Sequence, residues 1–572
     1  MIIPERLPQY FIHDDFDPSR YDDFVPYFET LQSATYSNVE EFIEWIDKLQ
    51  EFQRVASSEM AWSYINKSRD TSNVEYRKRY ELFVNEIIPK LSPQWMALNK
   101  KLLESEFVKD LQGTYYERYC TLVKNSFDLY TEKNILLQVL VSKKADEFAR
   151  IVASRNIFYD GKEQTIPQLS LYLKSEDRAV REEVWRLITS QTVKEYNQLD
   201  EIFTELVGLR HQIAINAGEE NFRDYQFKSF DRLEYTPEDC FVFHKAIEEY
   251  VLPLENEIVK NRKQILGLDE LRPWDLSVDI YGSHSLKPFS STEELIDGCI
   301  RIFNRLHPGL GEYLSIMKEV GHLDLESRKS KEMGGYNSPL YDRHIPFIFM
   351  NAVGLQRDVV TLLHEVGHAI HTFVTKDQSV VAYKSFPKEV AEFASMSMEL
   401  LTMDFWDEFY TNEEDLLQAK RQQLERVIEL LPRIAKVDAF QHWVYENPNH
   451  TSEERKQCWL DLSERFGNGN LISREGLEEY QHTGWQFQHI FRSPFYYIDY
   501  GIAQIGAVQM WANYKKNPQG TINSYLEALK LGGSKNMREV YEAAGIQFNL
   551  TPQFLKELMG FVSSELQALS KE

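Results

Sequence analysis

The chain has 572 residues, of which 64 are basic and 89 acidic, so its formal net charge is −25. Hydrophobic residues make up 43% of the chain, which is enough for a large core and excludes a wholly disordered protein. The acidic balance argues against nucleic acid or an anionic membrane as a partner, because both select clustered Lys and Arg. With only 25 Gly and 20 Pro, the composition predicts a mostly α-helical protein.

The first 36 residues are rich in Pro, Asp and aromatic side chains and predict an irregular arm. Helices are expected next: Ser37 and Glu40 have the spacing of a capping box, and apolar residues recur at helical period beyond them. Segment 158–168, FYDGKEQTIPQ, breaks this pattern. It predicts the boundary between a helical N-terminal lobe, residues 1–165, and a second region, residues 166–572.

Residues 334–354 differ in composition from the helical segments: they are rich in Gly and Pro and contain a β-prone run from Ile345 to Met350. This run predicts a hairpin or an edge strand. After it the pattern is again helical to the end of the chain.

The next segment, DVVTLLHEVGHAIHTFV (358–374), carries the motif H-E-x-x-H on a predicted buried helix. His364 and His368 are four residues apart, so both stand on one face and could reach one Zn²⁺ at about 2.0–2.1 Å. Glu365 is turned about 100° round the helix, where it would miss the metal but could serve as a general base toward a water on it. Gly367 costs roughly 1 kcal/mol relative to Ala, which indicates close packing against a crossing helix or a substrate backbone.

A third protein ligand is expected in the following predicted helix, residues 386–406. Glu392 and Glu399 lie on one stripe of a largely apolar helix, where unpaired carboxylates are costly to bury. Glu392 is predicted as the third ligand, and Glu389, one turn earlier, is its rival. Glu399 is predicted to hydrogen-bond a ligating histidine, and His371 to support the ligands rather than bind the metal. The pattern does not distinguish Zn²⁺ from Mn²⁺ or Co²⁺.

A third cluster lies near residue 490, where His489 precedes Tyr496, Tyr497 and Tyr500. Metal-assisted peptide hydrolysis develops negative charge on the carbonyl oxygen, which neutral Tyr or His donors can stabilise. The cluster is therefore a candidate partner for the metal-binding helix, although tyrosines also gather for packing alone.

Together, three motifs resemble the zinc peptidases of the thimet oligopeptidase and oligoendopeptidase F superfamily: H-E-x-G-H-x-x-H (364–371), E-x-x-S-x-x-x-E (392–399) and P-F-Y-x-x-x-Y (494–500). Segments 221–240, 273–275 and 334–351 are similar to the bacterial oligoendopeptidase F branch, and the resemblance covers residues 170–560. It implies a mostly α, two-lobed, zincin-type fold with a deep central channel. The small β-sheet would lie beside the active-site helix, and residues 166–572 would form the catalytic region and contribute to both lobes.

The resemblance also assigns roles. It implies one Zn²⁺ per chain held by His364, His368 and Glu392, with Glu392 rather than Glu389 as the third ligand. Tyr500 matches the tyrosine that stabilises the transition state, and His489 would assist it. The family has alternating tyrosines here, whereas this chain has the adjacent pair Tyr496 and Tyr497, so which of the two faces substrate is open.

The implied function is zinc-dependent hydrolysis of internal bonds in short oligopeptides, with the strand 345–350 pairing with an extended substrate. Two alternatives are open. A zinc exopeptidase, either a peptidyl-dipeptidase or a carboxypeptidase, would need a cation for the terminal carboxylate, for which Arg343 and Arg492 are available. A catalytically inactive peptide-binding scaffold would hold no stoichiometric metal.

A cytoplasmic location is expected. The first 16 residues contain acids where a signal peptide would be apolar, and no run of about 18 apolar residues is present. The cysteines are widely spaced, so neither a disulfide framework nor a thiolate zinc site is expected. The sequence does not indicate an oligomeric state.

Overall fold

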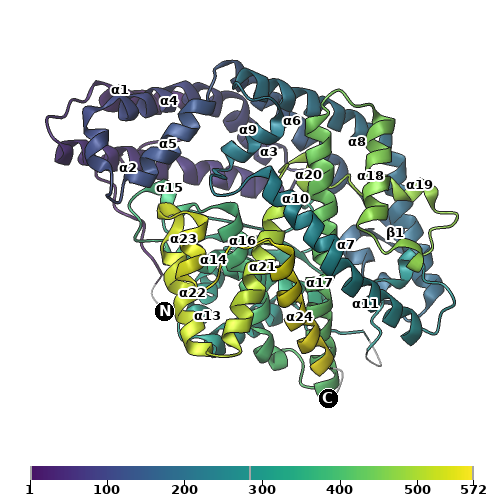
Figure 1. Cartoon of the computed structure of the whole chain (residues 1–572). Coiled ribbons are helices and arrows are strands. Elements are labelled where there is room, and N and C mark those ends of the chain that lie inside the picture. The colour runs from purple at the N-terminus through teal and green to yellow at the C-terminus, as the bar shows by residue number, and fades with distance from the viewer. Residues whose placement is uncertain (1–2, 282–284, 570–572) are drawn as a thin grey trace.

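Helices dominate the chain in the computed structural model, which describes residues 3–281 and 285–569 (Figure 1). In chain order the α-helices are α1 (Tyr21–Ser33), α2 (Val39–Arg69), α3 (Val74–Leu82), α4 (Ile88–Glu104), α5 (Glu117–Leu129), α6 (Lys133–Ala153), α7 (Ile166–Leu169), α8 (Arg178–Asn216), α9 (Phe222–Ser229), α10 (Pro237–Ala246), α11 (Leu252–Ile265), α12 (Thr292–Leu306), α13 (Leu310–Glu319), α14 (Gln356–Val374), α15 (Val381–Lys384), α16 (Lys388–Leu401), α17 (Glu413–Glu446), α18 (Ser452–Arg465), α19 (Glu478–Gln481), α20 (Gln488–Phe491), α21 (Tyr497–Tyr514), α22 (Pro518–Lys530), α23 (Met537–Ala543) and α24 (Pro552–Ala568). Within the described residues, no helix is both long enough and apolar enough to span a membrane.

Two large hydrophobic cores divide the molecule. The smaller core is built from residues between Ile12 and Val123 and also takes in Val380 and Tyr383, beside and within α15. The larger core is built from residues between Phe148 and Val562. In Figure 1 the purple and blue helices α1, α2, α4 and α5 lie together at one end of the molecule. The predicted boundary at residue 165 stays a prediction.

The predicted irregular arm at the N-terminus is wrong in its second half, because α1 forms there (residues 1 and 2 lie outside the described residues). Phe24, Phe28 and Leu31 are spaced by four and three residues, so they fall on one helix face and are all buried. Burial of that face outweighs the lost hydrogen bond at Pro26 inside the helix.

The helix predicted after Ser37 is α2, with its cap one residue later than expected. The Asn38 side chain accepts the backbone N–H of Glu41, and the Glu41 carboxylate accepts the N–H of Ser37. Asn is at least as good an N-cap as Ser, so the sequence offered two equivalent cap spacings and the structure uses the second.

The break at 158–168 contains a hairpin of β1 (Asn156–Tyr159) and β2 (Lys162–Thr165), paired antiparallel. Its two-residue loop is Asp160-Gly161, and both residues have positive φ, 52° and 76°. These angles suit a type I′ turn, for which Asp-Gly is a preferred pair.

The sheet beside α14 has the order β3-β5-β4, with β3 (Leu323–Glu326) parallel and β4 (Tyr336–Ser338) antiparallel to β5 (Phe347–Ala352). The β-prone run therefore forms the central strand, so the predicted edge position is wrong, although β4 and β5 do pair antiparallel. Residues 347–350 are all buried, as expected of a strand covered on both faces. An extended peptide cannot pair with β5, because both of its edges are occupied.

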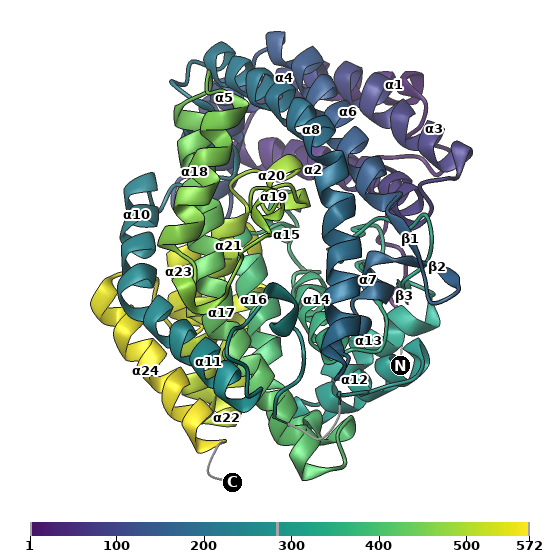
Figure 2. The ribbon, with the colours of Figure 1, turned by 90° about the vertical axis from the view of Figure 1, so that its right-hand side faces the viewer.

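The helices α14 and α16 cross closely near the centre of the molecule (Figure 2). A Cβ atom on Gly367 would lie 2.5 Å from the Cα of Ser395 and 2.7 Å from the carbonyl oxygen of Ala394. The glycine therefore permits a backbone approach that any side chain would prevent. Of the two partners expected for Gly367, the crossing helix is the one present.

Candidate metal centre and active site

The crossing of α14 and α16 brings together two histidines and a glutamate. The Glu392 Oε2 atom lies 3.3 Å from Nε2 of His364 and 3.6 Å from Nε2 of His368. Ligands of a tetrahedral Zn²⁺ with bonds of about 2.0–2.1 Å stand about 3.4 Å apart. The three side chains thus have the spacing of a zinc site.

The charge state of the group also suits a cation. Burial opposes ionisation of Glu392, but the nearby His368 and His364 lower the pKa of its carboxyl to about 2, so it is an anion at neutral pH. The side chains of His364 and His368 are 16% and 17% exposed, which leaves the group open on one side.

The carboxylate of Glu399 orients the first histidine, because its Oε1 atom lies 2.7 Å from Nδ1 of His364. Its other oxygen accepts a hydrogen bond of 3.0 Å from the side-chain amide of Gln423 on α17. This arrangement leaves Nε2 of His364 free to face a metal. Sequence reasoning missed Gln423, because it comes from a third helix.

His371 does not join this group. Its ring is fully buried and stacks on Phe386, and neither of its ring nitrogens has a hydrogen-bond partner among the described side chains. His371 lies on the predicted face of α14, but it is two turns beyond His364, and there the Phe386 ring covers its side chain.

The rival ligand Glu389 is occupied elsewhere. Its Oε1 atom accepts a hydrogen bond of 2.6 Å from Tyr235 and lies 3.3 Å from Nε of Arg232. Arg232 also donates to Asp499 at 2.5 Å and to the carbonyl of Phe495 at 2.6 Å. This buried network joins α16 to the start of α21, and no local pattern in the sequence predicts it.

Glu365 lies beside the three candidate ligands and is only 5% exposed. Burial raises the pKa of its carboxyl to about 8, and its Oε2 atom has no hydrogen-bond partner. A Cβ atom on Gly335 would lie 3.3 Å from Oε1 of Glu365, so glycine leaves the carboxylate room. A buried carboxyl group with a raised pKa and an unpaired oxygen is suited to exchange a proton with a neighbouring group.

These side chains line a cavity of 330 Å³, here called the metal cavity, whose lining includes His364, Glu365, His368, Glu392, His489, Tyr496 and Tyr500. Nε2 of His489 lies 3.3 Å from the hydroxyl of Tyr500. Burial lowers the pKa of His489 to about 4, so its ring is neutral near pH 7. Burial likewise raises the pKa of Tyr500 well above 10, which keeps its hydroxyl protonated.

The two adjacent tyrosines face different spaces. Tyr496 lines the metal cavity and donates a hydrogen bond of 2.5 Å to Oε1 of Glu392. Tyr497 lines a neighbouring cavity of 490 Å³. Phe495 has a left-handed backbone, φ 64°, and its N–H donates to Gln441 at 2.7 Å, so the turn before Tyr496 is strained and held.

The cations named for an exopeptidase are not free in the metal cavity. Arg492 lines that cavity, but it donates to Glu332 at 3.0 Å and to the Tyr64 hydroxyl at 2.9 Å. Arg343 is exposed and is not among the residues that line the metal cavity.

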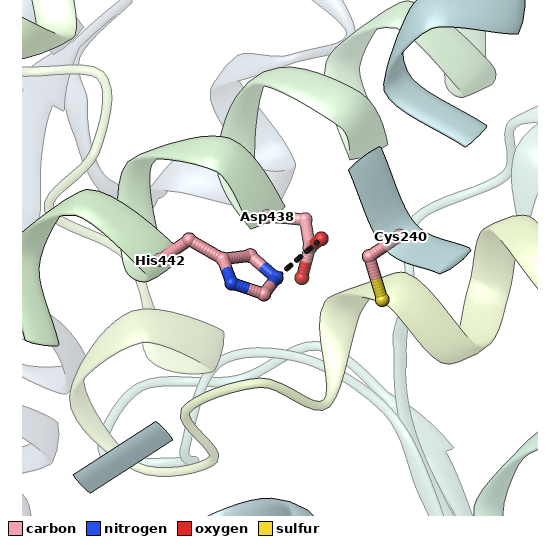
Figure 3. A group of neighbouring side chains, drawn as sticks. All are labelled: Cys240, Asp438 and His442. Atoms are coloured by element: carbon pink, nitrogen blue, oxygen red, sulfur yellow. Dashed lines mark ion pairs between the residues drawn. The ribbon is translucent and has the colours of Figure 1, made fainter. Parts of the chain in front are cut away.

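A second group of ligand-type side chains lies between α10 and α17, where Cys240, Asp438 and His442 meet (Figure 3). Oδ2 of Asp438 lies 2.8 Å from Nε2 of His244 and 3.2 Å from Nε2 of His442. Asp438 and Cys240 are fully buried and His442 is 2% exposed. The spacing of the cysteines did not predict this group, because its members are up to 202 residues apart and meet only by helix packing.

Comparison with known proteins supplies the family. The sequence model of peptidase family M3 matches residues 171–560, and that of the peptidase M3 N-terminal domain matches residues 16–130. Oligopeptidase PepF of Bacillus subtilis is 26% identical over 399 residues, which cover 68% of this chain and 57% of that protein. An oligoendopeptidase F homolog of Borreliella burgdorferi is 22% identical over 486 residues, 82% of this chain and 76% of its own length.

The fold has a similar solved counterpart in PZ peptidase A, determined with an inhibitor. The two chains are 27% identical, the match covers 98% of this chain and 99% of PZ peptidase A, and the TM-score is 0.92. The similarity therefore extends through both hydrophobic cores.

Proposed function

The chain belongs to peptidase family M3, in its oligoendopeptidase F branch, and from this premise we propose that it is a zinc-dependent endopeptidase of short oligopeptides. The observation that supports this best is the spacing of His364, His368 and Glu392, which fits a tetrahedral zinc site open on one side. The unpaired Glu365 carboxylate beside them fits a catalytic role better than an inactive scaffold.

One Zn²⁺ per chain would be held by the two histidines and Glu392, with Glu399 orienting His364. The metal would supply Lewis acidity toward the substrate carbonyl and would lower the pKa of a bound water. Everything else in the reaction falls to the side chains of this protein.

Glu365 is the general base in this proposal. Its Oε2 atom takes a proton from the attacking water and then delivers a proton to the leaving amine. His489 and Tyr500, both neutral and 3.3 Å apart, donate hydrogen bonds to the oxygen on which negative charge develops. Tyr496 restrains Glu392 through its hydrogen bond and also faces the substrate.

Substrate would bind as an added strand on β4 rather than on β5. Gly335, Tyr336 and Asn337 line the metal cavity, and within the described residues β4 pairs only with β5. The side-chain amide of Asn337 also donates to the carbonyl of Glu365 at 3.3 Å, which ties this strand to α14. Main-chain pairing at an edge would give affinity with little demand on substrate sequence.

Incubation of the purified protein with a mixed peptide library, with and without a chelator, tests the proposal by mass spectrometry of the products. Cleavage at internal bonds that the chelator abolishes and added Zn²⁺ restores is the expected result. Absence of cleavage by the zinc-loaded protein, or cleavage that a chelator does not affect, would contradict it.

A further inference from the structure

The cavity of 490 Å³ beside the metal cavity is lined by several basic side chains. Four arginines line it: Arg155, which is paired with Glu195, and three others without an ion-pair partner among the described residues. These three are Arg357 in the first turn of α14, and Arg426 and Arg433 on one face of α17. We call it the arginine cavity. His489 and Gln488 line both cavities, so the arginine cavity adjoins the proposed reaction site.

None of these three guanidinium groups forms an ion pair or a side-chain hydrogen bond with any described residue; Arg433 only lies 5.6 Å over the ring of Phe487. Two other charged residues that line the cavity already have ion-pair partners. Arg155 is paired with Glu195 at 2.7 Å. Glu332 is paired with Lys67 and Arg492.

Glu429 lies between Arg426 and Arg433 along α17 but forms no ion pair with either among the described residues. Burial raises the pKa of its carboxyl, although the charges of Arg262 and Arg426 oppose that shift. Asp358 cannot serve either, because its carboxylate accepts the backbone N–H groups of Val353, Gly354 and Leu355.

Gathering these cations has a cost in free energy. The charge of Arg426, together with burial and Arg433, lowers the pKa of Arg357 to about 10. Arg357 also stands at the positive end of the α14 dipole, where a cation is unfavourable. Arg357 and Arg433 are nevertheless solvent-exposed and unpaired, so both are accessible to an anion that enters the cavity.

We propose that the arginine cavity binds the C-terminal carboxylate of the peptide substrate, and that this contact sets which bond is cleaved. The inference rests on the proposed peptidase function. A carboxylate offers two coplanar oxygens, which match the fork of a guanidinium better than any other group that every short peptide carries. Its binding would direct the peptide past His489, with the C-terminal product on the arginine side of the metal centre.

The test compares one peptide of eight neutral residues as the free acid and as the C-terminal amide. Products and initial rates are measured for the wild type, Arg426→Gln and Arg433→Gln. Arg421→Gln is the matched control, because Arg421 is on the same helix but contacts Tyr281 outside the arginine cavity. Metal content and circular dichroism show whether each variant is folded.

For the wild type we expect kcat/KM to be at least about tenfold higher for the free acid than for the amide, mainly through KM, as for a charge-assisted contact. This ratio should fall toward one in Arg426→Gln and Arg433→Gln and stay at the wild-type value in Arg421→Gln. The cleaved bond should also lie at a fixed distance from the C-terminus when the free acid is lengthened at its N-terminus.

Equal rates for acid and amide in the wild type, or an unchanged ratio in Arg433→Gln, would overturn the inference. Chelator-sensitive cleavage of the amide would still support the proposed function, so the two proposals can fail separately. An amide ending in Glu that is cleaved as fast as the free acid would show that the cavity accepts any carboxylate, and the C-terminal assignment would be wrong. Phosphate that inhibits acid and amide alike, except in Arg433→Gln, would identify a site for inorganic anions instead.

Discussion

Two buried groups in this molecule each combine two histidines with one carboxylate, and their surroundings differ. At the crossing of α14 and α16, Glu392 faces His364 and His368, whose side chains are 16% and 17% exposed. Between α10 and α17, Asp438 contacts His442 (Figure 3) and also His244, and the two histidines are 2% and 3% exposed.

Contact between residues of metal-ligand type is therefore not sufficient to form a reaction site. The first group opens onto a cavity and has Glu365 beside it with an unpaired oxygen. In the second, helices enclose the group: Asp438 is fully buried, and both histidines are at most 3% exposed. We interpret the second group as a buried ion pair that joins α10 to α17, and the predictions below test this contrast.

The largest effect is expected for Glu365→Gln. The amide cannot accept the proton of the attacking water, so kcat/KM should fall roughly 10³- to 10⁴-fold. Zinc content should stay at the wild-type level, because Glu365 is not among the proposed ligands. Initial rates and metal analysis of the same preparation check both statements, and near-normal activity would overturn the general-base assignment.

Glu392→Gln should lose zinc, whereas Glu389→Gln should retain it. The two glutamates are one turn apart on α16, but only Glu392 faces the histidines, while Glu389 is held by Arg232 and Tyr235. Metal content after dialysis against a weak chelator is the measurement. Retention of zinc by Glu392→Gln together with its loss from Glu389→Gln would reverse the assignment.

Tyr500→Phe should lower kcat roughly 10²- to 10³-fold with little change in KM, since its hydroxyl is proposed to contact an oxygen that becomes anionic only in the transition state. Tyr514→Phe is the matched control, because Tyr514 lies at the other end of α21 and lines neither the metal cavity nor the arginine cavity. An effect confined to KM would assign Tyr500 to substrate binding.

Glu399→Gln should weaken zinc binding roughly 10- to 100-fold without abolishing it, because Glu399 contacts His364 at 2.7 Å rather than the metal position. A zinc-buffered titration measures the shift. Unchanged affinity would show that Gln423 and the helix packing suffice to orient the histidine.

Asp438→Asn should keep one zinc ion per chain and an unchanged kcat. It should lower the free energy of unfolding by roughly 2–4 kcal/mol, as expected when a buried ion pair loses one partner. Burial opposes ionisation of Asp438, but His442 and His244 hold its pKa below the ordinary value of 3.8. A lowered folded-state pKa stabilises the protein above that value, so the difference from wild type should shrink as pH falls below about 4. Two zinc ions per wild-type chain, and one in the variant, would contradict the ion-pair interpretation.

The sequence predicted those parts of the site that depend on one helix alone. His364, Glu365 and His368 take their relative positions from helical periodicity, and Gly367 signalled the close crossing. The same reasoning failed for His371, because helical phase places it on the correct face but says nothing of Phe386, which covers it. Local composition identified the β-prone run, whereas the central position of β5 depends on partners 20 and more residues away along β3.

Tertiary structure decided every question that involves two elements. Both Glu389 and Glu392 suit the helix period, but Glu389 pairs with Arg232 from a distant segment and therefore does not face the histidines. Tyr496 and Tyr497 are neighbours in sequence but line different cavities. The three unpaired arginines of the arginine cavity, Arg357, Arg426 and Arg433, span 77 positions of the sequence and show no common pattern in it. The physical reason is that local periodicity determines which face of an element a side chain occupies, whereas packing between elements determines what that face meets.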